Sequence, residues 1–217
     1  MIELVVFDFD GTLVDSMWVW KKVDRIFLKK RNIEVPSNLQ KNISGLSFTE
    51  TAEYFKNKFN LVDSIEKIKK EWIELSSSLY RKKVNFKADV LKATKDLYQK
   101  GIKMCVASSN HKELIESYLK QKKINDYFED IFTGCEFERG KNSETFYNNI
   151  ARFYRIECKK ILFIDDIYES IHAANKAGLK TVGVYDEYTV SDNLKKNSDF
   201  FITNFKMLKD IISSFNQ

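Results

Sequence analysis

The chain has 217 residues, of which 43% are hydrophobic, so it can bury one large core or two smaller ones. Its 36 basic and 31 acidic side chains give a formal net charge of +5, and the lysines are spread along the chain. This spread is typical of solvated helix faces, and we expect no nucleic-acid partner. The N-terminus lacks the pattern of a signal peptide, and no apolar run reaches membrane-spanning length. The three cysteines are widely spaced and odd in number, which favours reduced thiols over a set of disulfides. The composition therefore predicts a cytoplasmic protein with no membrane partner.

The first predicted element is a strand over residues 4–7, followed at once by an acidic turn with Asp8, Asp10 and Gly11. Four consecutive apolar residues suit a strand that is buried on both faces, as in a parallel sheet. Ligands of such sheets bind at the carboxyl ends of the strands. Two carboxylates crowded there repel each other unless a cation or a shared proton relieves them. The turn therefore indicates a metal site and phosphate chemistry. A simple Asp-Gly turn is the alternative interpretation.

Residues 17–83 are predicted to form a helical domain inserted into the chain. Apolar residues recur there at helical spacing, and no convincing strand interrupts them. The stretch from Ser47 to Glu50 has the pattern of a capping box, which begins a helix. We therefore expect a helical cap over 17–83 and an α/β core made of residues 1–16 and 84–217.

From residue 86 onward, strands and helices are predicted to alternate. The expected strands cover 102–107, 130–133, 160–164, 181–185 and 200–203, and the expected helices cover 88–100, 112–122, 143–154 and a segment that ends at Gly178. Gly101 and Gly178 have the position of glycines that cap helix C-termini. The alternation predicts the α/β class, with a Rossmann-like parallel sheet flanked by helices.

Polar residues with a use in phosphate chemistry follow several of these strands. In a parallel sheet they would gather at one edge, and they are Asp8, Asp10, Ser108, Asn110, Lys141, Asp165 and Asp166. Carboxylates can hold Mg²⁺, attack phosphorus or move a proton. Hydroxyl and ammonium groups can bind phosphate oxygens. Each residue alone is a weak signal, whereas their order at successive strand ends is a strong one.

This order resembles that of the haloacid dehalogenase (HAD) superfamily, in the branch with a helical (C1-type) cap near the β-phosphoglucomutases and related phosphatases. The stretch from Asp8 to Ser16 matches the first motif in full, and the stretch from Val106 to Ser108 resembles the second. Lys141 matches the third motif, and the pair Asp165-Asp166 matches the acidic fourth motif. The resemblance covers essentially the whole chain.

The resemblance implies a role for each matched residue. Asp8 would be the nucleophile and Asp10 the general acid/base, while Ser108, Asn110 and Lys141 would bind the substrate phosphate. Mg²⁺ would be held by the Asp8 carboxylate, the backbone carbonyl of Asp10, Asp165 and Asp166. The implied activity is that of a Mg²⁺-dependent phosphatase that acts on a small phosphorylated metabolite, such as a sugar phosphate, through an aspartyl-phosphate intermediate. We expect a monomer or weak dimer.

Some positions depart from the pattern of the superfamily. Asn142 follows Lys141, where many relatives have proline, and Asp165 stands where many have glycine. Ser170 occupies a position that often carries a further aspartate. Glu169 is close to the fourth motif, but its place on the first turn of a helix also fits a surface residue that complements the helix dipole, so we leave it out of the predicted site.

Two alternative activities are weighed against the phosphatase. In similar sugar-phosphate mutases a cap histidine and a cap arginine hold polar substrate groups, whereas Trp20 and Phe48 stand at those positions here. Hydrolysis is therefore favoured over a β-phosphoglucomutase-like activity. A non-enzymatic phospho-accepting signalling module is a remote alternative, because receiver modules are shorter and lack a helical insert. A nucleotide-binding P-loop is rejected, since Asn142 replaces the required serine or threonine after Lys141.

Overall fold

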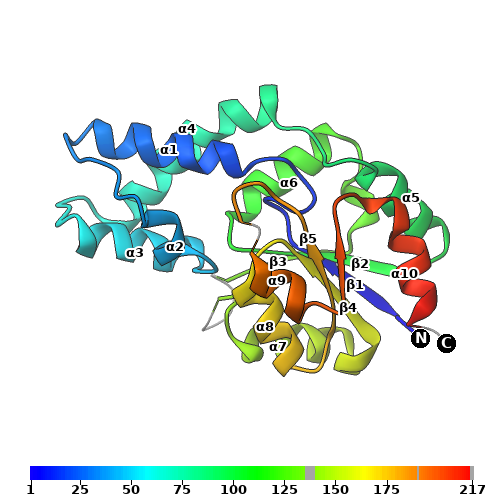
Figure 1. Cartoon of the computed structure of the whole chain (residues 1–217). Coiled ribbons are helices and arrows are strands. Elements are labelled where there is room, and N and C mark those ends of the chain that lie inside the picture. Colours follow the sequence, from blue (N-terminus) through cyan, green and yellow to red (C-terminus); the bar gives the residue numbers. More distant parts are fainter. Residues whose placement is uncertain (135–139, 190, 216–217) are drawn as a thin grey trace.

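The computed structural model describes residues 1–134, 140–189 and 191–215. Its centre is a six-stranded parallel sheet with the strand order β3-β2-β1-β4-β5-β6 (Figure 1). The strands are β1 (Leu4–Phe7), β2 (Lys103–Ser108), β3 (Asp130–Thr133), β4 (Ile161–Asp165), β5 (Lys180–Val184) and β6 (Phe200–Ile202). The predicted α/β fold with a parallel sheet is confirmed. Because the strand order reverses direction at β1, the carboxyl end of β1 faces the crevice where open α/β sheets bind ligands.

The apolar sequence of β1 reflects burial on both faces of the sheet. Val5 and Phe7 belong to one hydrophobic cluster and Leu4 and Val6 to the other, and all four side chains are fully buried. Alternate residues of a strand point to opposite faces, so each face needs its own cover of helices. This is why no polar residue interrupts the strand.

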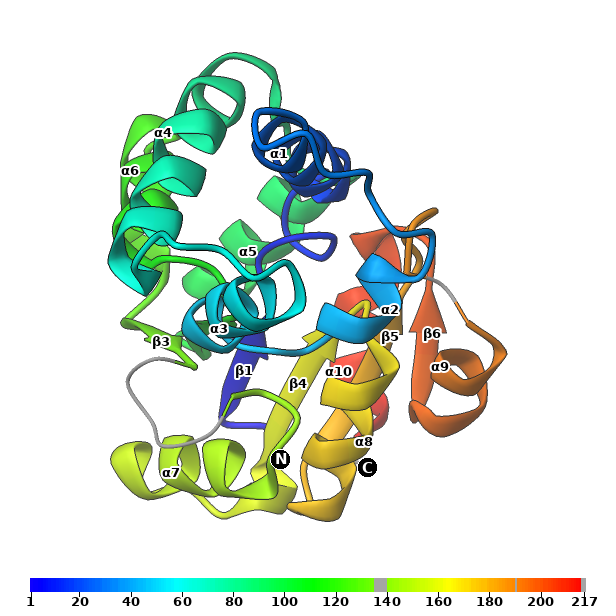
Figure 2. The same cartoon turned by 90° about the vertical axis from the view of Figure 1, so that its left-hand side faces the viewer.

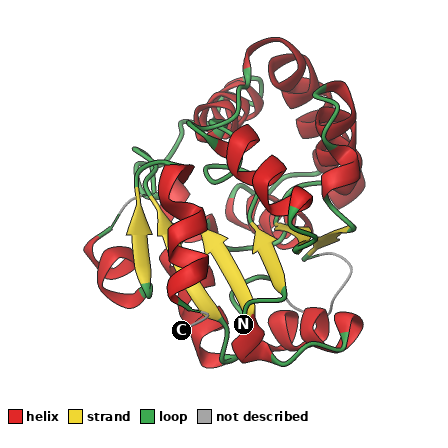
Figure 3. Ribbon diagram, turned by 90° about the vertical axis from the view of Figure 1, so that its right-hand side faces the viewer, coloured by secondary structure: helices red, strands yellow, loops and turns green. Residues whose placement is uncertain are grey.

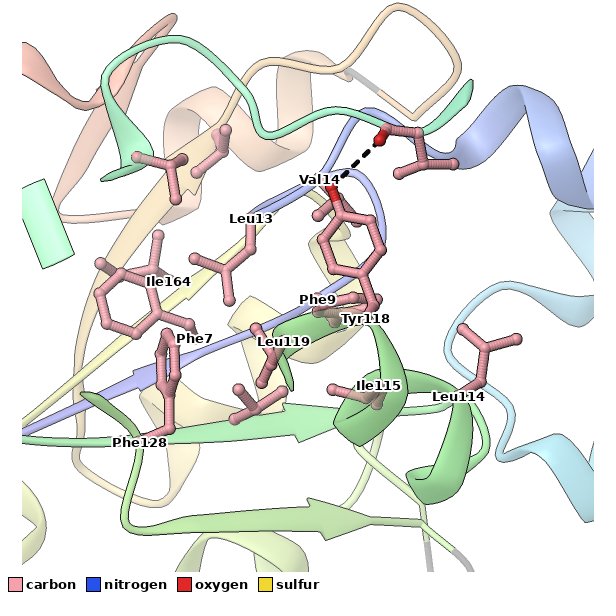
Figure 4. Close-up of a cluster of buried hydrophobic side chains, with 14 of the residues drawn as sticks. Phe7, Phe9, Leu13, Val14, Leu114, Ile115, Tyr118, Leu119, Phe128 and Ile164 are labelled. Atoms are coloured by element: carbon pink, nitrogen blue, oxygen red, sulfur yellow. Dashed lines mark hydrogen bonds between the residues drawn. The ribbon is translucent and has the colours of Figure 1, made fainter. Parts of the chain in front are cut away.

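Helices cover both faces of the sheet (Figure 3). One cluster includes side chains of α5 (Val90–Gln99), α6 (Lys112–Gln121) and α10 (Leu208–Ser214), and the other includes side chains of α7 (Glu144–Tyr154), α8 (Tyr168–Lys176) and α9 (Asp192–Asn197). Figure 4 shows part of the first cluster, where Phe7 of β1 meets Phe128 edge to face with ring centroids 6.0 Å apart. In the same view the Tyr118 hydroxyl donates a hydrogen bond to the backbone oxygen of Val84 at 3.2 Å.

The four helices between β1 and α5 lie together beside the sheet (Figures 1 and 2). They are α1 (Met17–Lys29), α2 (Leu39–Ile43), α3 (Phe48–Lys58) and α4 (Ile65–Lys83). Phe27, Phe55 and Trp72 join three of these helices, with ring centroids 4.9 to 5.9 Å apart. The predicted capping box is confirmed, because the Ser47 side chain accepts from the Glu50 backbone and the Glu50 side chain accepts from the Ser47 backbone.

Several element boundaries differ from the prediction by one or two residues, and some short elements were not predicted. Helices α9 and α10 have six and seven residues, too few for a hydrophobic period to stand out from the surrounding sequence. Three short 3₁₀ segments, η1 (Asn125–Tyr127), η2 (Cys158–Lys160) and η3 (Phe205–Met207), were also missed.

The two predicted glycine caps are confirmed by φ angles of +68° at Gly101 and +86° at Gly178. Within the described ranges no helix is long and apolar enough to cross a membrane.

Candidate active site

The predicted site residues meet at the carboxyl ends of β1, β2 and β4. Asp8 follows β1 directly, Ser108 is the last residue of β2, and Asp165 is the last residue of β4. The loop before α7 brings Lys141 to the same edge. Beside these residues lies a cavity of about 410 Å³, whose other wall is made by residues of the helical segment 17–83. The site is therefore a pocket between the sheet edge and the helices of that segment.

Lys141 is the cation at the centre of the site. Its ammonium group contacts Asp8 and lies 2.7 Å from Oδ2 of Asp165, and its side chain is 2% exposed. Burial acts to lower the pKa of Lys141, but Asp165 and Asp8 outweigh it and raise the pKa above its ordinary value. Lys141 therefore stays charged and holds the two carboxylates together.

Three buried carboxylates form a cluster beneath the cavity. One oxygen each from Asp8, Asp165 and Asp166 lies within 4.8 Å of the others. Burial raises the pKa of Asp8 well above its ordinary value, although Lys141 opposes this, and burial together with Asp165 raises the pKa of Asp166 to about 7. Lys141 is a single positive charge beside three carboxyl groups, so it cannot neutralise all three when they are ionised. Carboxylate oxygens are also the ligands that a hard divalent cation prefers, so the cluster fits Mg²⁺.

The backbone and two hydroxyl groups fix the position of Asp166. Thr12 donates to Oδ1 of Asp166 at 3.1 Å, and Thr189 donates to Oδ2 at 2.5 Å. Gly11 has a φ angle of +84°, and a Cβ atom at this position would overlap the Asp166 carboxylate. A glycine is therefore required both for the turn and for the close approach of Asp166.

Asp10 lies apart from the three-carboxylate cluster and accepts three hydrogen bonds. Ser16 donates to its Oδ1 at 2.5 Å, Asn110 donates to its Oδ2 at 2.7 Å, and the Tyr80 hydroxyl donates to its Oδ1. Burial raises the pKa of Asp10, and these hydrogen bonds act in the opposite direction. Burial outweighs the hydrogen bonds, so the environment favours the protonated form of Asp10, which is the form that can donate a proton.

Two hydrogen bonds to the acidic residues of the site were not predicted from the sequence. Tyr80 and Thr189 come from segments far along the chain, and no local spacing links them to the acidic residues that they contact. The Asn110 amide, predicted as a phosphate ligand, is directed at Asp10. Glu169 lines the cavity, but it accepts a hydrogen bond from Ser44 at 3.2 Å and does not belong to the three-carboxylate cluster.

The two residues at which the sequence analysis weighed a mutase activity lie on the cavity wall. Trp20 and Phe48 both line the cavity, with ring centroids 6.0 Å apart, and Trp20 also packs 6.1 Å from the ring of Tyr80. The structure thus places two aromatic side chains on this part of the cavity wall.

Residues 5–184 match the model of the haloacid dehalogenase-like hydrolase family. Since this stretch is most of the chain, the protein belongs to that family, as its sequence motifs predict. A phosphoglycolate phosphatase of Aquifex aeolicus is 29% identical over 83% of both chains. A phosphorylated carbohydrates phosphatase of Thermotoga maritima is 22% identical over 83% of this chain and 84% of its own length.

Solved structures confirm the architecture. The phosphate complex of CbbY from Rhodobacter sphaeroides superposes with a TM-score of 0.84 over 95% of this chain and 96% of that chain, at 17% sequence identity. At this identity the likeness shows the fold alone. The six-stranded parallel sheet flanked by helices is thus the Rossmann-like fold of HAD-type proteins.

Proposed function

We propose that this protein is a Mg²⁺-dependent phosphatase that hydrolyses a small phosphorylated metabolite through an aspartyl-phosphate formed on Asp8. The observation that carries the proposal is the position of Asp8, which lines the cavity and contacts the buried ammonium of Lys141. A carboxylate held in this way can attack an electrophile at the floor of the pocket. The names of the relatives, which are phosphatases of phosphoglycolate and of phosphorylated carbohydrates, support the same chemistry.

The proposed reaction has two steps, with Asp10 active in both. First, an Asp8 oxygen bonds to phosphorus, the bond from phosphorus to the substrate oxygen breaks, and protonated Asp10 gives its proton to that leaving oxygen. In the second step Asp10, now a carboxylate, takes a proton from water as the water oxygen bonds to phosphorus. The bond from phosphorus to Asp8 then breaks, which releases phosphate and restores both aspartates.

Three further residues are proposed to bind the substrate phosphate. Lys141 would neutralise part of its charge, while the Ser108 hydroxyl and the Asn110 amide would donate hydrogen bonds to its oxygens. Ser108 and Asn110 both line the cavity, which supports this assignment. Asn110 would then share its amide group between Asp10 and the phosphate.

The proposed Mg²⁺ ligands are the carboxylates of Asp8, Asp165 and Asp166 and the backbone carbonyl of Asp10. When bound, the cation would neutralise the charge that the phosphate and the acidic cluster bring together. We further propose that residues 17–83 act as a cap over a core made of 1–16 and 84–217, because helices from this segment form one wall of the cavity. A cap that closes over the substrate excludes bulk water from the first step.

Hydrolysis is favoured over phosphoryl migration by the identity of two residues in the cavity wall. Trp20 and Phe48 offer no charged group to hold a second phosphate. A mutase must retain and reorient a doubly phosphorylated intermediate, so the lack of such groups at these positions argues for release of phosphate to water.

Phosphate release tests the proposal directly. The purified protein is assayed with p-nitrophenyl phosphate and with sugar phosphates, in Mg²⁺ and in excess chelator, beside Asp8→Asn. We expect turnover that is lost both with chelator and in the variant. Turnover that survives either treatment would contradict the mechanism, and conversion of a hexose 1-phosphate into its 6-phosphate without phosphate release would favour the mutase.

A further inference from the structure

Residues 44–50 of the helical segment contact the loop that carries Lys141, on both sides of that lysine. We call this stretch the docking segment, and it ends in the first turn of α3. Gly140 and Asn142, the neighbours of Lys141 in the chain, both lie against it. Lys141 itself contacts the carboxylates of the core. The loop is thus held between the sheet edge and the helical segment.

On the N-terminal side of Lys141, the docking segment lies close against the core backbone. A Cβ atom at Gly140 would lie 3.2 Å from the backbone nitrogen of Ser47 and 3.0 Å from Oε2 of Glu50. At Gly134, which follows β3, a Cβ atom would lie only 2.7 Å from Cβ of Ser47. A side chain at Gly134 would therefore displace the docking segment, so glycine is needed for this close approach.

On the C-terminal side of Lys141, the amide of Asn142 packs against the backbone of the docking segment. Nδ2 of Asn142 donates to the backbone oxygen of Ser44 at 3.3 Å. Gly45 has a φ angle of +72°, and a Cβ atom there would lie 1.9 Å from Oδ1 of Asn142. Gly45 is therefore needed both for the backbone turn and for the place of the Asn142 amide.

Ser44 has a second contact with the core. Its hydroxyl donates to Oε2 of Glu169, in the first turn of α8, at 3.2 Å. Asn142 and Glu169 both lie beside a sequence motif, and the predicted site gives neither of them a role. Because both bond the same residue of the docking segment, they form a specific contact between this segment and the core.

We propose that Asn142 and Gly45 are positioning residues, which dock the helical segment against the loop of Lys141 and so place this lysine to bind the substrate phosphate. A lysine side chain has many rotamers, and its ammonium group is held in one place only if its backbone is held too. Asp8 and Asp165 hold the ammonium group, and the docking segment holds the backbone on either side of it. This inference rests on the proposed phosphatase function, in which Lys141 binds the phosphate.

An effect through Lys141 differs measurably from an effect through the organic part of the substrate. Inorganic phosphate has the group that Lys141 would bind, as every phosphate ester has, but it has no organic part. A variant that displaces Lys141 should therefore weaken inorganic phosphate as an inhibitor. A variant that only alters contacts with the organic part should leave this inhibition unchanged.

Asn142→Ala tests the proposal with p-nitrophenyl phosphate as substrate, in Mg²⁺. We expect kcat/KM to fall by about 3- to 10-fold and the inhibition constant of inorganic phosphate to rise by about 3- to 10-fold, because the loss of one hydrogen bond costs about this much. Asn197→Ala is the matched control, since it removes an amide that donates to the backbone oxygen of Asn193 at 2.8 Å. It should change neither quantity. A fall in kcat/KM with an unchanged inhibition constant in Asn142→Ala would overturn the proposal.

Gly45→Ala tests the same contact from the docking segment. The added methyl group displaces the Asn142 amide, so we expect both quantities to change in the same directions by about tenfold. Gly101→Ala is the control for backbone strain, because Gly101 has a φ angle of +68° and no atom within 4 Å of the added methyl group. Equal changes of the inhibition constant in Gly45→Ala and Gly101→Ala would contradict the role of the contact.

A double variant shows whether Asn142 acts through Lys141. When Asn142→Ala is added to Lys141→Met, the inhibition constant of inorganic phosphate should change by less than about twofold, since the residue through which Asn142 acts is gone. The full effect of Asn142→Ala in this background would overturn the proposal. A thermal unfolding curve confirms that each variant is folded, and the single variants decide the matter if Lys141→Met does not fold.

Phosphate release by the wild type separates this inference from the proposed function. Release that neither Asn142→Ala nor Gly45→Ala alters would overturn the positioning role and leave the phosphatase proposal standing. An absence of release from p-nitrophenyl phosphate and from sugar phosphates in Mg²⁺ would overturn the proposed function, and the positioning role with it.

Discussion

Tyr80, near the C-terminal end of α4, donates a hydrogen bond to Asp10, which lies seventy residues earlier in the chain, in the turn after β1. The Tyr80 ring stacks on Phe9, with centroids 6.3 Å apart and planes 10° from parallel. This contact joins the helical segment 17–83 to the proposed general acid/base. A movement of α4 would therefore change the surroundings of Asp10.

Removal of the Tyr80 hydroxyl should impair the reaction. Tyr80→Phe takes one of three donors from Asp10, so we expect kcat for p-nitrophenyl phosphate to fall about tenfold and stability to fall by about 1 kcal/mol. Tyr118→Phe is the matched control, because its hydroxyl is also buried but bonds the Val84 backbone oxygen. It should show a similar loss of stability with kcat retained. Equal effects of the two variants on kcat would mean that Tyr80 acts only through packing.

Gly11 should be irreplaceable because of its contact with Asp166. In Gly11→Ala the new methyl group overlaps the Asp166 carboxylate and the φ angle is unfavourable, so we expect activity to fall about 10- to 100-fold and stability by about 2–4 kcal/mol. Gly101→Ala has a similar φ of +68° with no atom near the added methyl group, and it should cost only about 1–2 kcal/mol with activity kept. Urea unfolding and phosphate release measure both effects. Similar losses of activity in the two variants would contradict the role of the close approach.

Lys141 should contribute to both activity and stability. Lys141→Met leaves Asp8 and Asp165 buried without their cation, so we expect phosphate release to fall about 10²- to 10³-fold and stability at pH 8 to fall by about 3–5 kcal/mol. Lys159→Met removes an exposed lysine from its pair with Glu157 and is the control, with little change in either measurement. A Lys141→Met protein of unchanged stability would show that Lys141 is not needed to balance the carboxylates.

The stability of the protein should depend on pH through Asp24. Burial in the helical segment raises the native pKa of Asp24 to about 7, against an ordinary value of 3.8, so between about pH 4 and 7 the folded protein holds a proton that the unfolded chain releases. Its contribution to stability is therefore lost as the pH rises through this window, and it levels off above pH 7. Asp24→Asn removes this dependence. The difference in free energy of unfolding between variant and wild type should thus shift in favour of the variant by about 2–3 kcal/mol from pH 5 to pH 8.

Asp63→Asn provides the control for this pH dependence. Hydrogen bonds from Lys67 and Arg31 hold the pKa of Asp63 below its ordinary value, so Asp63 is ionised in both states from pH 5 to pH 8. The variant should therefore lose a constant amount of stability over that range. If Asp24→Asn also shows a constant difference across that range, the native acidity assigned to Asp24 is wrong.

The strands of the sheet are predicted well from the sequence because each one is marked by a short apolar run of neighbouring residues. The apolar run of β1 and its acidic turn predict a buried strand with Asp8 at its carboxyl end, and the structure has both features. Parallel pairing then brings Ser108 and Asp165 to the same edge without further information. Lys141 is harder to place from the sequence, because the loop before α7 must fold toward the sheet before it can contact Asp8.

The remaining contacts depend on packing between distant segments. Tyr80 reaches Asp10 only because α4 returns to the sheet edge, and Thr189 reaches Asp166 from the loop after β5. Asp24 lies among charged residues of α1, where an acidic residue normally faces solvent, and nothing in its spacing reveals that it is buried. These residues carry no pattern of their own, so only the tertiary structure identifies them.

The central claim, that Asp8 carries the phosphoryl group, can be tested by a chemical trap. The protein is mixed with p-nitrophenyl phosphate and Mg²⁺, quenched in acid and digested, and the peptides are analysed by mass spectrometry, with Asp10→Asn included because slow hydrolysis should accumulate the intermediate. We predict a hydroxylamine-sensitive phosphoryl group on Asp8 alone, absent from Asp8→Asn. Turnover without a labelled Asp8, or a phosphoryl group on another residue, would contradict the account.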